Sequence, residues 1–201
     1  MHKHLRLFVC LLVVGAGLDG GTAGAGNDKY QVTSGRVVVV CPLTVGGGFE
    51  AKTEAVSGQV SLGSDQPGSL NGALSVDLRT LKTGIGMRDR HMRDNYLEVE
   101  KGPGFETATI EGIQIEKLDG KTTFNGTLVL HGERRAVSGL ATIARQGGDY
   151  TVEAECPVQV SEFYIPMPSY LGVGVQDQIR IKIALTVSSI TTTARAQQQE
   201  N

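Results

Sequence analysis

Most of the chain alternates between apolar and polar residues with a period of two. This pattern is typical of strands that bury one face and expose the other. The clearest example is Ile179 to Val187, in which large apolar residues are separated by arginine, lysine, alanine and threonine. Similar alternation runs from Tyr150 to Val160, from Phe124 to Leu130 and from Leu70 to Leu78. Since no long segment repeats apolar residues at helical spacing, the pattern predicts an all-β protein.

Four weaker segments complete the set of predicted strands. They are the β-branched run Val37 to Cys41, the alternating run Val56 to Leu62, and the segments Phe105 to Lys117 and Ala136 to Ala144. The turn sequences SDQPGS, LDGK and QGGD separate neighbouring strands with glycine, proline and aspartate. Eight strands at this spacing predict an antiparallel sheet closed into a barrel, or a sandwich of two sheets.

Two longer connections interrupt the strands. The charged segment Arg79 to Lys101 holds a short helical stretch, and we expect it to form an insertion across or beside one end of the barrel. The loop Ser161 to Gln178 is rich in aromatic residues, proline and glycine, and we expect it to border the same kind of opening.

The N-terminus has the features of a signal peptide. Lys3 and Arg6 precede the apolar run Leu7 to Leu18, and small residues lead to a cleavage motif that ends at Ala25. This run is shorter than the roughly 20 residues that a membrane-spanning helix needs. We therefore predict a cleaved signal peptide at residues 1–25, a barrel domain at 26–190 and a disordered polar tail at 191–201. The mature protein is expected in the periplasm or outside the cell, and not as an integral membrane protein.

Charge and cysteine content narrow the functional classes. The chain has 19 basic and 21 acidic residues, and this balance argues against a nucleic-acid partner, which favours a basic surface. Cys41 and Cys156 remain after cleavage, and they admit two interpretations: a disulfide in an oxidising compartment, or two small apolar thiols in the core. The sequence leaves the oligomeric state, including a homodimer, open.

Catalytic and metal-binding motifs are scarce. His91 and His131 are the histidines of the mature chain, and their wide separation does not match a zinc or copper site, so we predict neither a metal nor another cofactor. No G-x-S-x-G motif, P-loop or dinucleotide fingerprint is present. An enzyme acting on a quinone or ester remains an alternative, with these two histidines as the candidate acid–base groups.

The segment MRDRHMRDN concentrates the charge of the predicted insertion. On a helix, Asp89 and Arg93 are four residues apart, as are Arg90 and Asp94, so each pair can meet on one surface. We expect a helix whose charges neutralise each other at the end of the barrel. Direct contact of Arg88 or His91 with the polar head of a ligand is the alternative.

Two motifs resemble those of the YceI-like polyisoprenoid-binding family. The segment LRTLKTGIGMRDRHMRDNYLEVEKGP matches its central motif, and GTLVLHGERRAV resembles a later strand and turn of the family. The central matches are Leu81, Thr83, Gly84, Arg88, Asp89, His91, Arg93, Val99, Glu100, Lys101 and Pro103. Ala136 stands where the family has a proline in the turn.

The resemblance implies a lipocalin-like barrel that binds a long isoprenoid, such as a polyprenyl or quinone-like lipid, in an apolar lumen. The period-two pattern agrees, because an eight-stranded barrel has room for packed side chains or one small ligand. The expected lumen-facing residues are Leu74, Val76, Phe124, Leu128, Leu130, Val152, Ala154, Val158, Ile179, Ile181 and Ile183. Arg88, Asp89 and His91 are the candidates for a lid or for contact with the ligand head group. The leading hypothesis is a carrier without catalytic activity, and the alternative is an envelope interaction module with a filled core.

Overall fold

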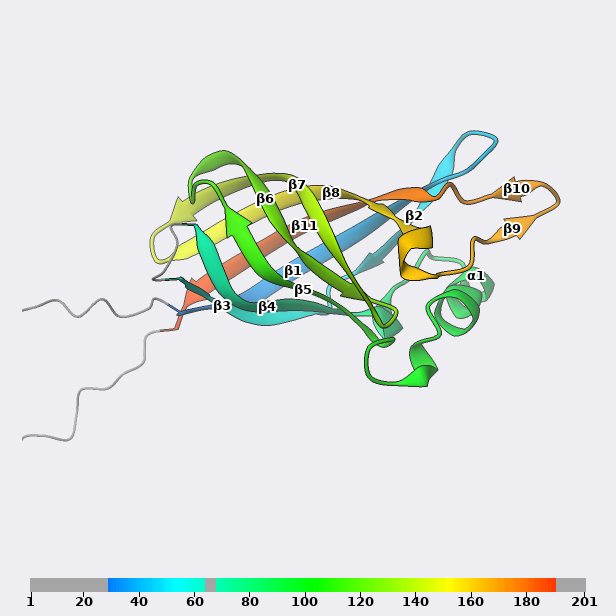
Figure 1. The fold of residues 1–201 in the computed structure, drawn as a ribbon, viewed down its shortest axis with the longest axis horizontal. Coiled ribbons are helices and arrows are strands. Elements are labelled where there is room, and N and C mark those ends of the chain that lie inside the picture. The colour runs from blue at the N-terminus through cyan, green and yellow to red at the C-terminus, as the bar shows by residue number, and fades with distance from the viewer. Residues whose placement is uncertain (1–28, 64–67, 191–201) are drawn as a thin grey trace, which may run out of the picture.

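A closed antiparallel barrel forms the body of the protein in a computed structural model, which describes residues 29–63 and 68–190 (Figure 1). The predicted signal peptide at 1–25 and the predicted tail at 191–201 lie outside the described residues. The eight barrel strands are β1 (Lys29–Pro42), β3 (Val56–Leu62), β4 (Ser69–Asp77), β5 (Thr107–Ile115), β6 (Gly120–Leu130), β7 (Glu133–Gln146), β8 (Asp149–Gln159) and β11 (Gln178–Ser189).

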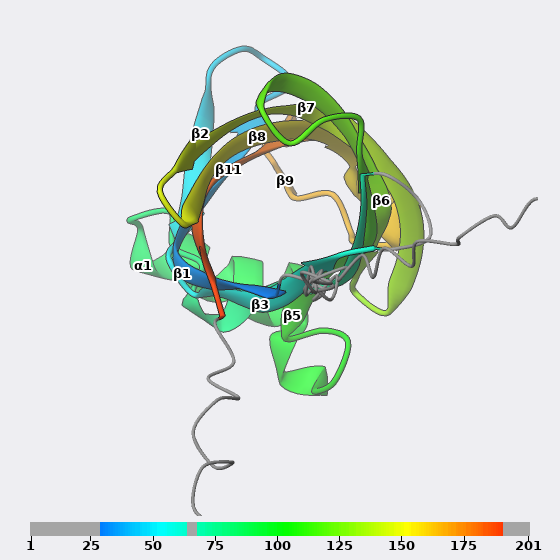
Figure 2. The same ribbon diagram turned by 90° about the vertical axis from the view of Figure 1, so that its left-hand side faces the viewer.

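Pairing of the last strand with the first closes the sheet. β1 pairs with β11 from Tyr30 opposite Ser189 to Val40 opposite Arg180, and each other neighbouring pair of barrel strands is also antiparallel. Figure 2 shows the resulting ring of strands along its axis. The prediction of an eight-stranded antiparallel barrel is confirmed, and each of the eight predicted segments overlaps one of its strands.

A short strand, β2 (Gly48–Thr53), was not predicted. It pairs with the second half of β1, from Val37 opposite Thr53 to Pro42 opposite Gly48, whereas β3 pairs with the first residues of β1. β2 also receives the long insertion, because Lys52 and Lys82 exchange two backbone hydrogen bonds of 2.7 and 3.0 Å. This strand therefore joins the barrel wall to the insertion.

The two ends of the barrel differ in their connections (Figure 1). Short turns and both ends of the described chain lie at one end, where the rings of Tyr30 and Tyr150 pack edge to face with centroids 5.4 Å apart. Tyr30, Val60 and Val187 are buried together there. We call this the closed end.

The other end, which we call the mouth, carries the long connections. Between β4 and β5 lie the 3₁₀ turn η1 (Leu78–Thr80), the helix α1 (Gly86–His91), the π-helical turn η2 (Met92–Tyr96) and the 3₁₀ turn η3 (Val99–Lys101). Between β8 and β11 lie the 3₁₀ turn η4 (Val160–Phe163) and a small hairpin of β9 (Ser169–Tyr170) and β10 (Val173–Gly174). None of the helices in the described chain is long and apolar enough to cross a membrane.

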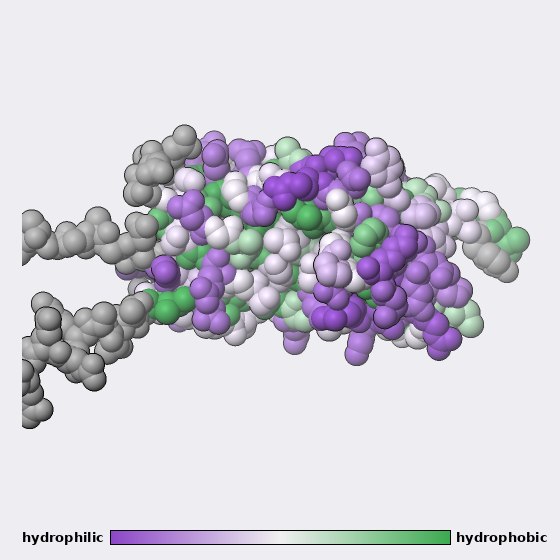
Figure 3. Space-filling view, turned by 60° about the horizontal axis from the view of Figure 1, so that its bottom comes forward, coloured by the Kyte–Doolittle hydropathy of each residue, from purple (hydrophilic) through white to green (hydrophobic). Residues whose placement is uncertain are grey.

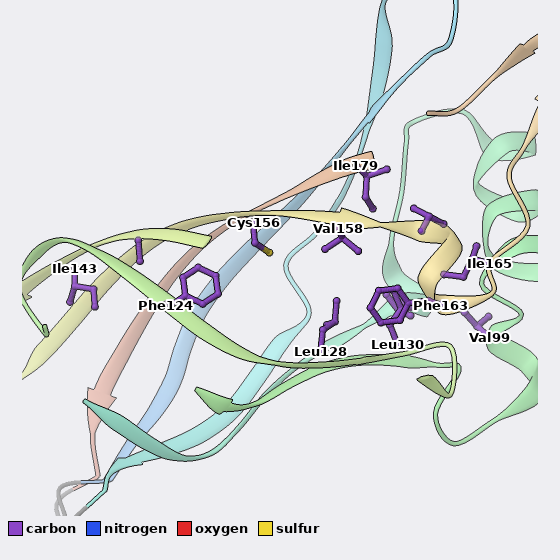
Figure 4. Close-up of a cluster of buried hydrophobic side chains, with 13 residues drawn as sticks. Val99, Phe124, Leu128, Leu130, Ile143, Cys156, Val158, Phe163, Ile165 and Ile179 are labelled. Atoms are coloured by element: carbon purple, nitrogen blue, oxygen red, sulfur yellow. The ribbon is translucent and has the colours of Figure 1, made fainter. Parts of the chain in front are cut away.

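The main apolar core lies inside the barrel and extends under the mouth (Figure 4). Strands β6, β8 and β11 contribute alternate residues to it, as the period-two pattern requires. Phe163 of η4 is its most deeply buried large side chain, with 1% of its surface exposed. The mouth segments are thus packed onto the barrel by their own apolar side chains.

Candidate ligand-binding site

An apolar cavity of about 550 Å³ occupies the barrel and opens at the mouth. The register of the strands explains why the wall of the cavity is apolar. Val39, Ile181 and Cys156 lie opposite one another on β1, β11 and β8, and all three line the cavity. Because side chains alternate across a strand, the residues two positions away face inward as well. The cavity is therefore built from successive rows of inward-facing apolar side chains.

Most of the residues predicted to face the lumen line this cavity. The lining members of that set are Leu74, Val76, Phe124, Leu128, Leu130, Ile179, Ile181 and Ile183. Val152, Ala154 and Val158 share the inward face of β8 but belong to the packed core without lining the cavity. The period-two pattern thus identified the correct face, whereas the position of the empty space depends on how the side chains pack in three dimensions.

Sequence reasoning missed the lining residues from β1, β2, β5 and the mouth. Val37, Val39 and Cys41 on β1 and Ala108 and Ile110 on β5 line the barrel part of the cavity. The mouth part includes Ile85, Met87, Met92, Tyr96, Ile165, Met167 and Val175. The strand residues carried a usable signal, because they follow the same alternation, but the mouth residues lie on irregular segments without a period.

Phe124 on β6 lies at the deep part of the cavity, away from the mouth residues Val99 and Ile165 (Figure 4). Its partner across the β6–β7 ladder is Gly139. A Cβ atom at Gly139 would lie 2.7 Å from the Phe124 ring and 2.3 Å from the backbone oxygen of Glu155. The Phe124 ring therefore occupies the space that a side chain on β7 would need.

Arg88 is the one charged side chain among the described residues that line the cavity, beside the imidazole of His91. Its guanidinium lies 4.2 Å from the centroid of the Phe49 ring, and its Nε donates a 2.9 Å hydrogen bond to the hydroxyl of Thr83. The ring of β2 and the loop before α1 thus hold the guanidinium in place. A planar cation at an apolar opening is suited to a carboxylate, phosphate or other electron-rich head group.

Asp89 does not line the cavity, although it was expected at the lid or head group. It is buried, and its carboxylate accepts hydrogen bonds from the hydroxyl and the backbone N–H of Thr83, the latter at 2.6 Å. These hydrogen bonds, with the nearby charges of Arg93 and Arg88, hold the pKa of Asp89 below its ordinary value. Asp89 therefore fixes the loop that positions Arg88.

The prediction that the charges of the helix form ion pairs along its surface is wrong. The described residues show no ion pair between Asp89 and Arg93 or between Arg90 and Asp94. Arg93 instead donates a 3.2 Å hydrogen bond to the carbonyl of Leu81, and its charge acts on Asp89 only from a longer distance. The reason is the backbone, because α1 lasts only six residues and continues as a π-helical turn. The wider turn removes the i,i+4 alignment on which the expectation relied.

His131 lies outside the cavity lining and joins three mouth segments. Its Nδ1 lies 2.9 Å from the carbonyl oxygen of Phe163 and its Nε2 lies 3.1 Å from the carboxylate of Glu98. Phe105 packs edge to face on the imidazole, with centroids 4.7 Å apart. The structure therefore keeps the two histidines apart: His91 is exposed at the cavity mouth, and His131 connects the β6–β7 turn to η3 and η4.

Both cysteines are free and line the cavity. Cys41 lies on β1 and Cys156 on β8, and β11 lies between these strands. Two strand spacings amount to roughly 10 Å, beyond the ~7 Å that a disulfide spans between Cα atoms. The structure fits the interpretation of two apolar core thiols, and the disulfide does not fit. Burial raises the pKa of each thiol to about 11, with Arg88 opposing the rise at Cys41.

Metal ligands are not clustered in the described part of the chain. No group of three or more histidine, cysteine, aspartate or glutamate side chains there could hold a metal ion. The chemistry that the site can offer with its own residues is burial of an apolar chain, with a cation and an imidazole at its opening.

A closed antiparallel barrel around an apolar cavity with one open end defines a protein of the lipocalin-like fold class. The comparisons agree with this class and specify it further: the YceI-like domain matches residues 30–187. The chain belongs to the YceI-like family. No curated protein matches the chain.

Solved structures share the fold at low sequence identity. BcnA of Burkholderia cenocepacia aligns with a TM-score of 0.63 and 19% identity, over 76% of this chain and 95% of that one. A polyisoprenoid-binding domain from Saccharophagus degradans, implicated in plant cell wall breakdown, aligns with a TM-score of 0.61 and 14% identity, over 80% and 98%. The YceI protein of Campylobacter jejuni aligns with a TM-score of 0.52 and 16% identity, over 72% and 86%.

Proposed function

We propose that the protein binds a long-chain isoprenoid, a polyprenyl or quinone-like lipid, in the barrel cavity and carries or sequesters it in the cell envelope. The observation that carries this proposal is the apolar cavity of about 550 Å³, continuous from the barrel to its mouth. Cavities that bind small molecules commonly measure roughly 300–1,000 Å³ and are mostly apolar. The description of the Saccharophagus degradans domain as polyisoprenoid-binding supports the same ligand class.

The energetics favour a prenyl chain. Burial of one methylene contributes about 0.8 kcal/mol, so a five-carbon isoprene unit offers ~3–4 kcal/mol before the cost of ordering the chain. The rows of valine, leucine and isoleucine provide this burial without any directional contact. A few units account for tight binding, and catalysis is not needed for this function.

The head group of the ligand would lie at the mouth. Arg88 and His91 line the opening there, and Arg88 is held by Thr83 and Phe49. A quinone carbonyl, a hydroxyl or a phosphate would accept hydrogen bonds from the guanidinium. Side chains do not fill the cavity, and this argues against the alternative of an interaction module with a filled core.

The first experiment identifies any lipid that remains bound to the protein during purification. Protein purified without detergent is analysed by native mass spectrometry, and its organic extract is analysed for prenyl lipids. We expect a retained apolar ligand of isoprenoid mass. Protein that carries no lipid and also fails to bind added prenyl alcohol would contradict the proposal.

A cavity-filling variant provides the matched test. Ala108 lines the cavity from β5, and Ala108→Phe places a ring in the existing space without requiring a buried charge. The control is Leu140→Phe, because Leu140 is exposed on the outside of β7. We expect Ala108→Phe to lose the ligand while retaining its melting temperature, and Leu140→Phe to retain both.

The envelope location rests on the predicted signal peptide and has its own test. Cell fractionation of the full chain is compared with that of a chain lacking residues 2–25. We expect the full chain in the periplasm or medium and the shortened chain in the cytoplasm. Cytoplasmic full-length protein would contradict the location while leaving the ligand proposal intact.

A further inference from the structure

Two hairpins at the mouth are bonded to each other and extend beyond the barrel (Figure 1). One is the turn between β1 and β2, residues 43–47, and the other consists of β9, β10 and their turn. Thr44 donates its N–H to the carbonyl of Gly174 at 2.9 Å, and Gly174 returns a 3.0 Å hydrogen bond to the Thr44 hydroxyl. Leu43 and Val175 form a further bridge. We call these bonded hairpins the mouth platform.

The tips of the mouth platform are apolar and exposed. Val45 is 69% exposed and Leu171 is 85% exposed. Neither residues 42–49 nor residues 165–175 contain a charged side chain. Leu171 also has a φ of 48°, a left-handed conformation that leucine rarely adopts and that turns of this kind usually give to asparagine or glycine. An exposed leucine in a disfavoured conformation is an indication of function rather than of packing.

The insertion around helix α1 adds apolar and cationic residues to the same end. Ile85 and Met87 are 54% and 71% exposed, and both also line the cavity. The segment 82–94 contains four basic residues, Lys82, Arg88, Arg90 and Arg93. It contains two acidic residues, Asp89 and Asp94, and Asp89 is buried against Thr83. Figure 3 shows hydrophilic side chains gathered over the helical insertion, with hydrophobic ones at the end of the molecule beyond it.

We propose that the mouth docks on the surface of an anionic lipid bilayer. The tips of the mouth platform and the exposed side chains of Ile85 and Met87 enter the interface, and the basic residues of the insertion meet the negative head groups. Apolar side chains combined with lysine and arginine on one surface are the usual composition of interfacial membrane binding. This proposal extends the proposed function, because the cavity then opens onto the phase that holds an isoprenoid.

A second copy of the chain fits this surface less well. In a two-fold dimer the same patch meets itself, so the arginines of α1 would approach those of the partner. Like charges brought together disfavour such a contact, whereas an anionic bilayer neutralises them. Charge complementarity therefore favours the membrane over self-association.

The experiment is flotation of the protein with vesicles of phosphatidylcholine alone and of phosphatidylcholine mixed with phosphatidylglycerol. We compare the wild type with the double variant Val45→Thr/Leu171→Asn, in which asparagine suits the left-handed position. The control is Leu140→Asn, which removes a leucine that is 68% exposed on the side of the barrel. Binding of a short prenyl alcohol without vesicles is measured in parallel, as is the molecular mass in solution.

We expect the wild type to float with the anionic vesicles, and added salt to weaken this binding. The double variant should bind them roughly tenfold less, since it loses two buried apolar side chains, while Leu140→Asn binds as the wild type does. Unchanged vesicle binding of the double variant, no binding by the wild type, or a dimer abolished by the double variant would each overturn the docking proposal. Prenyl alcohol binding reports separately on the cavity, so a loss there contradicts the proposed function and not the docking.

Discussion

The closed end and the mouth of the barrel use apolar side chains in opposite ways. At the closed end, Tyr30, Val60 and Val187 fill the space between the strands and are almost fully buried. At the mouth, Met87 and Leu171 remain mostly exposed, and an apolar cavity that side chains do not fill opens there. The difference separates two roles: contacts at the closed end stabilise the fold, whereas the mouth keeps apolar surface accessible to a ligand. Substitutions at the two ends should therefore have different consequences.

The largest expected effect is on stability at the closed end. Tyr30→Ala removes an aromatic ring that packs on Tyr150, and it should lower the free energy of unfolding by about 3–5 kcal/mol. Chemical denaturation measures this loss, and Tyr30→Phe is the control that keeps the ring. Affinity for a prenyl alcohol should change little at temperatures where the variant is folded. A loss below ~1 kcal/mol would contradict the role of this cluster as the closure of the barrel.

A smaller loss of stability is expected at the base of the mouth. His131→Ala removes both hydrogen bonds of the imidazole and leaves the carbonyl of Phe163 without that donor, at a cost of roughly 1–3 kcal/mol. His131 has a φ of 53°, a left-handed conformation that alanine adopts only with strain. His131→Asn is the matched control, because asparagine tolerates this conformation and the comparison separates backbone strain from the loss of the imidazole. Hydrogen exchange should increase in η3 and η4 and remain unchanged at the closed end. Uniform destabilisation of both ends would contradict this local role.

Asp89 provides a test that depends on pH. Asp89→Asn should lower the free energy of unfolding at neutral pH by about 1–2 kcal/mol, because Thr83 loses a charged acceptor. The pKa of Asp89 is lower in the folded protein than in the unfolded chain, so its stabilisation is present above the unfolded value. It is lost as the pH falls through the folded pKa, and the wild type and the variant should converge in acid. A constant difference down to pH ~2 would show that the charge is not the cause.

The smallest expected effect is on the rate at which Cys41 is alkylated, and it does not involve the stability of the fold. Cys41 lines the cavity, and burial raises its pKa to about 11, so alkylation by an apolar maleimide at pH ~8 should be slow. A ligand in the cavity should slow it severalfold further without changing the unfolding transition. Comparing protein with and without added prenyl alcohol measures the protection, and Cys156→Ser isolates the reaction at Cys41. Equal rates would indicate that the ligand binds elsewhere.

Sequence reasoning succeeded for the barrel because a period of two is a direct consequence of strand geometry. β11 shows this most clearly, since Ile179, Ile181 and Ile183 all face the cavity as expected. β2 was missed because three consecutive glycines, Gly46 to Gly48, resemble a turn at its start and because only two apolar residues, Phe49 and Ala51, alternate in it. Its partner is supplied by the extended half of β1, which is a tertiary effect that local patterns do not contain.

The mouth was predicted less well, for a different physical reason. Arg88 and His91, which the charged segment offered as alternative contacts for a ligand head group, both line the cavity. The role of Asp89 depends on Thr83, six positions earlier, and the π-helical turn changes which side chains align. Hydrogen bonds between irregular segments follow from the folded backbone, so helical spacing alone could not supply them.

The absence of a side chain at Gly139 determines where the Phe124 ring can lie at the deep part of the cavity. The ring of Phe124 lies over Gly139 of β7, at a distance that leaves no room for a side chain there. A side chain at position 139 would collide with the backbone oxygen of Glu155 and with the Phe124 ring, so neither could keep its present position. The depth of the cavity is thus governed in part by Gly139, which does not itself line it.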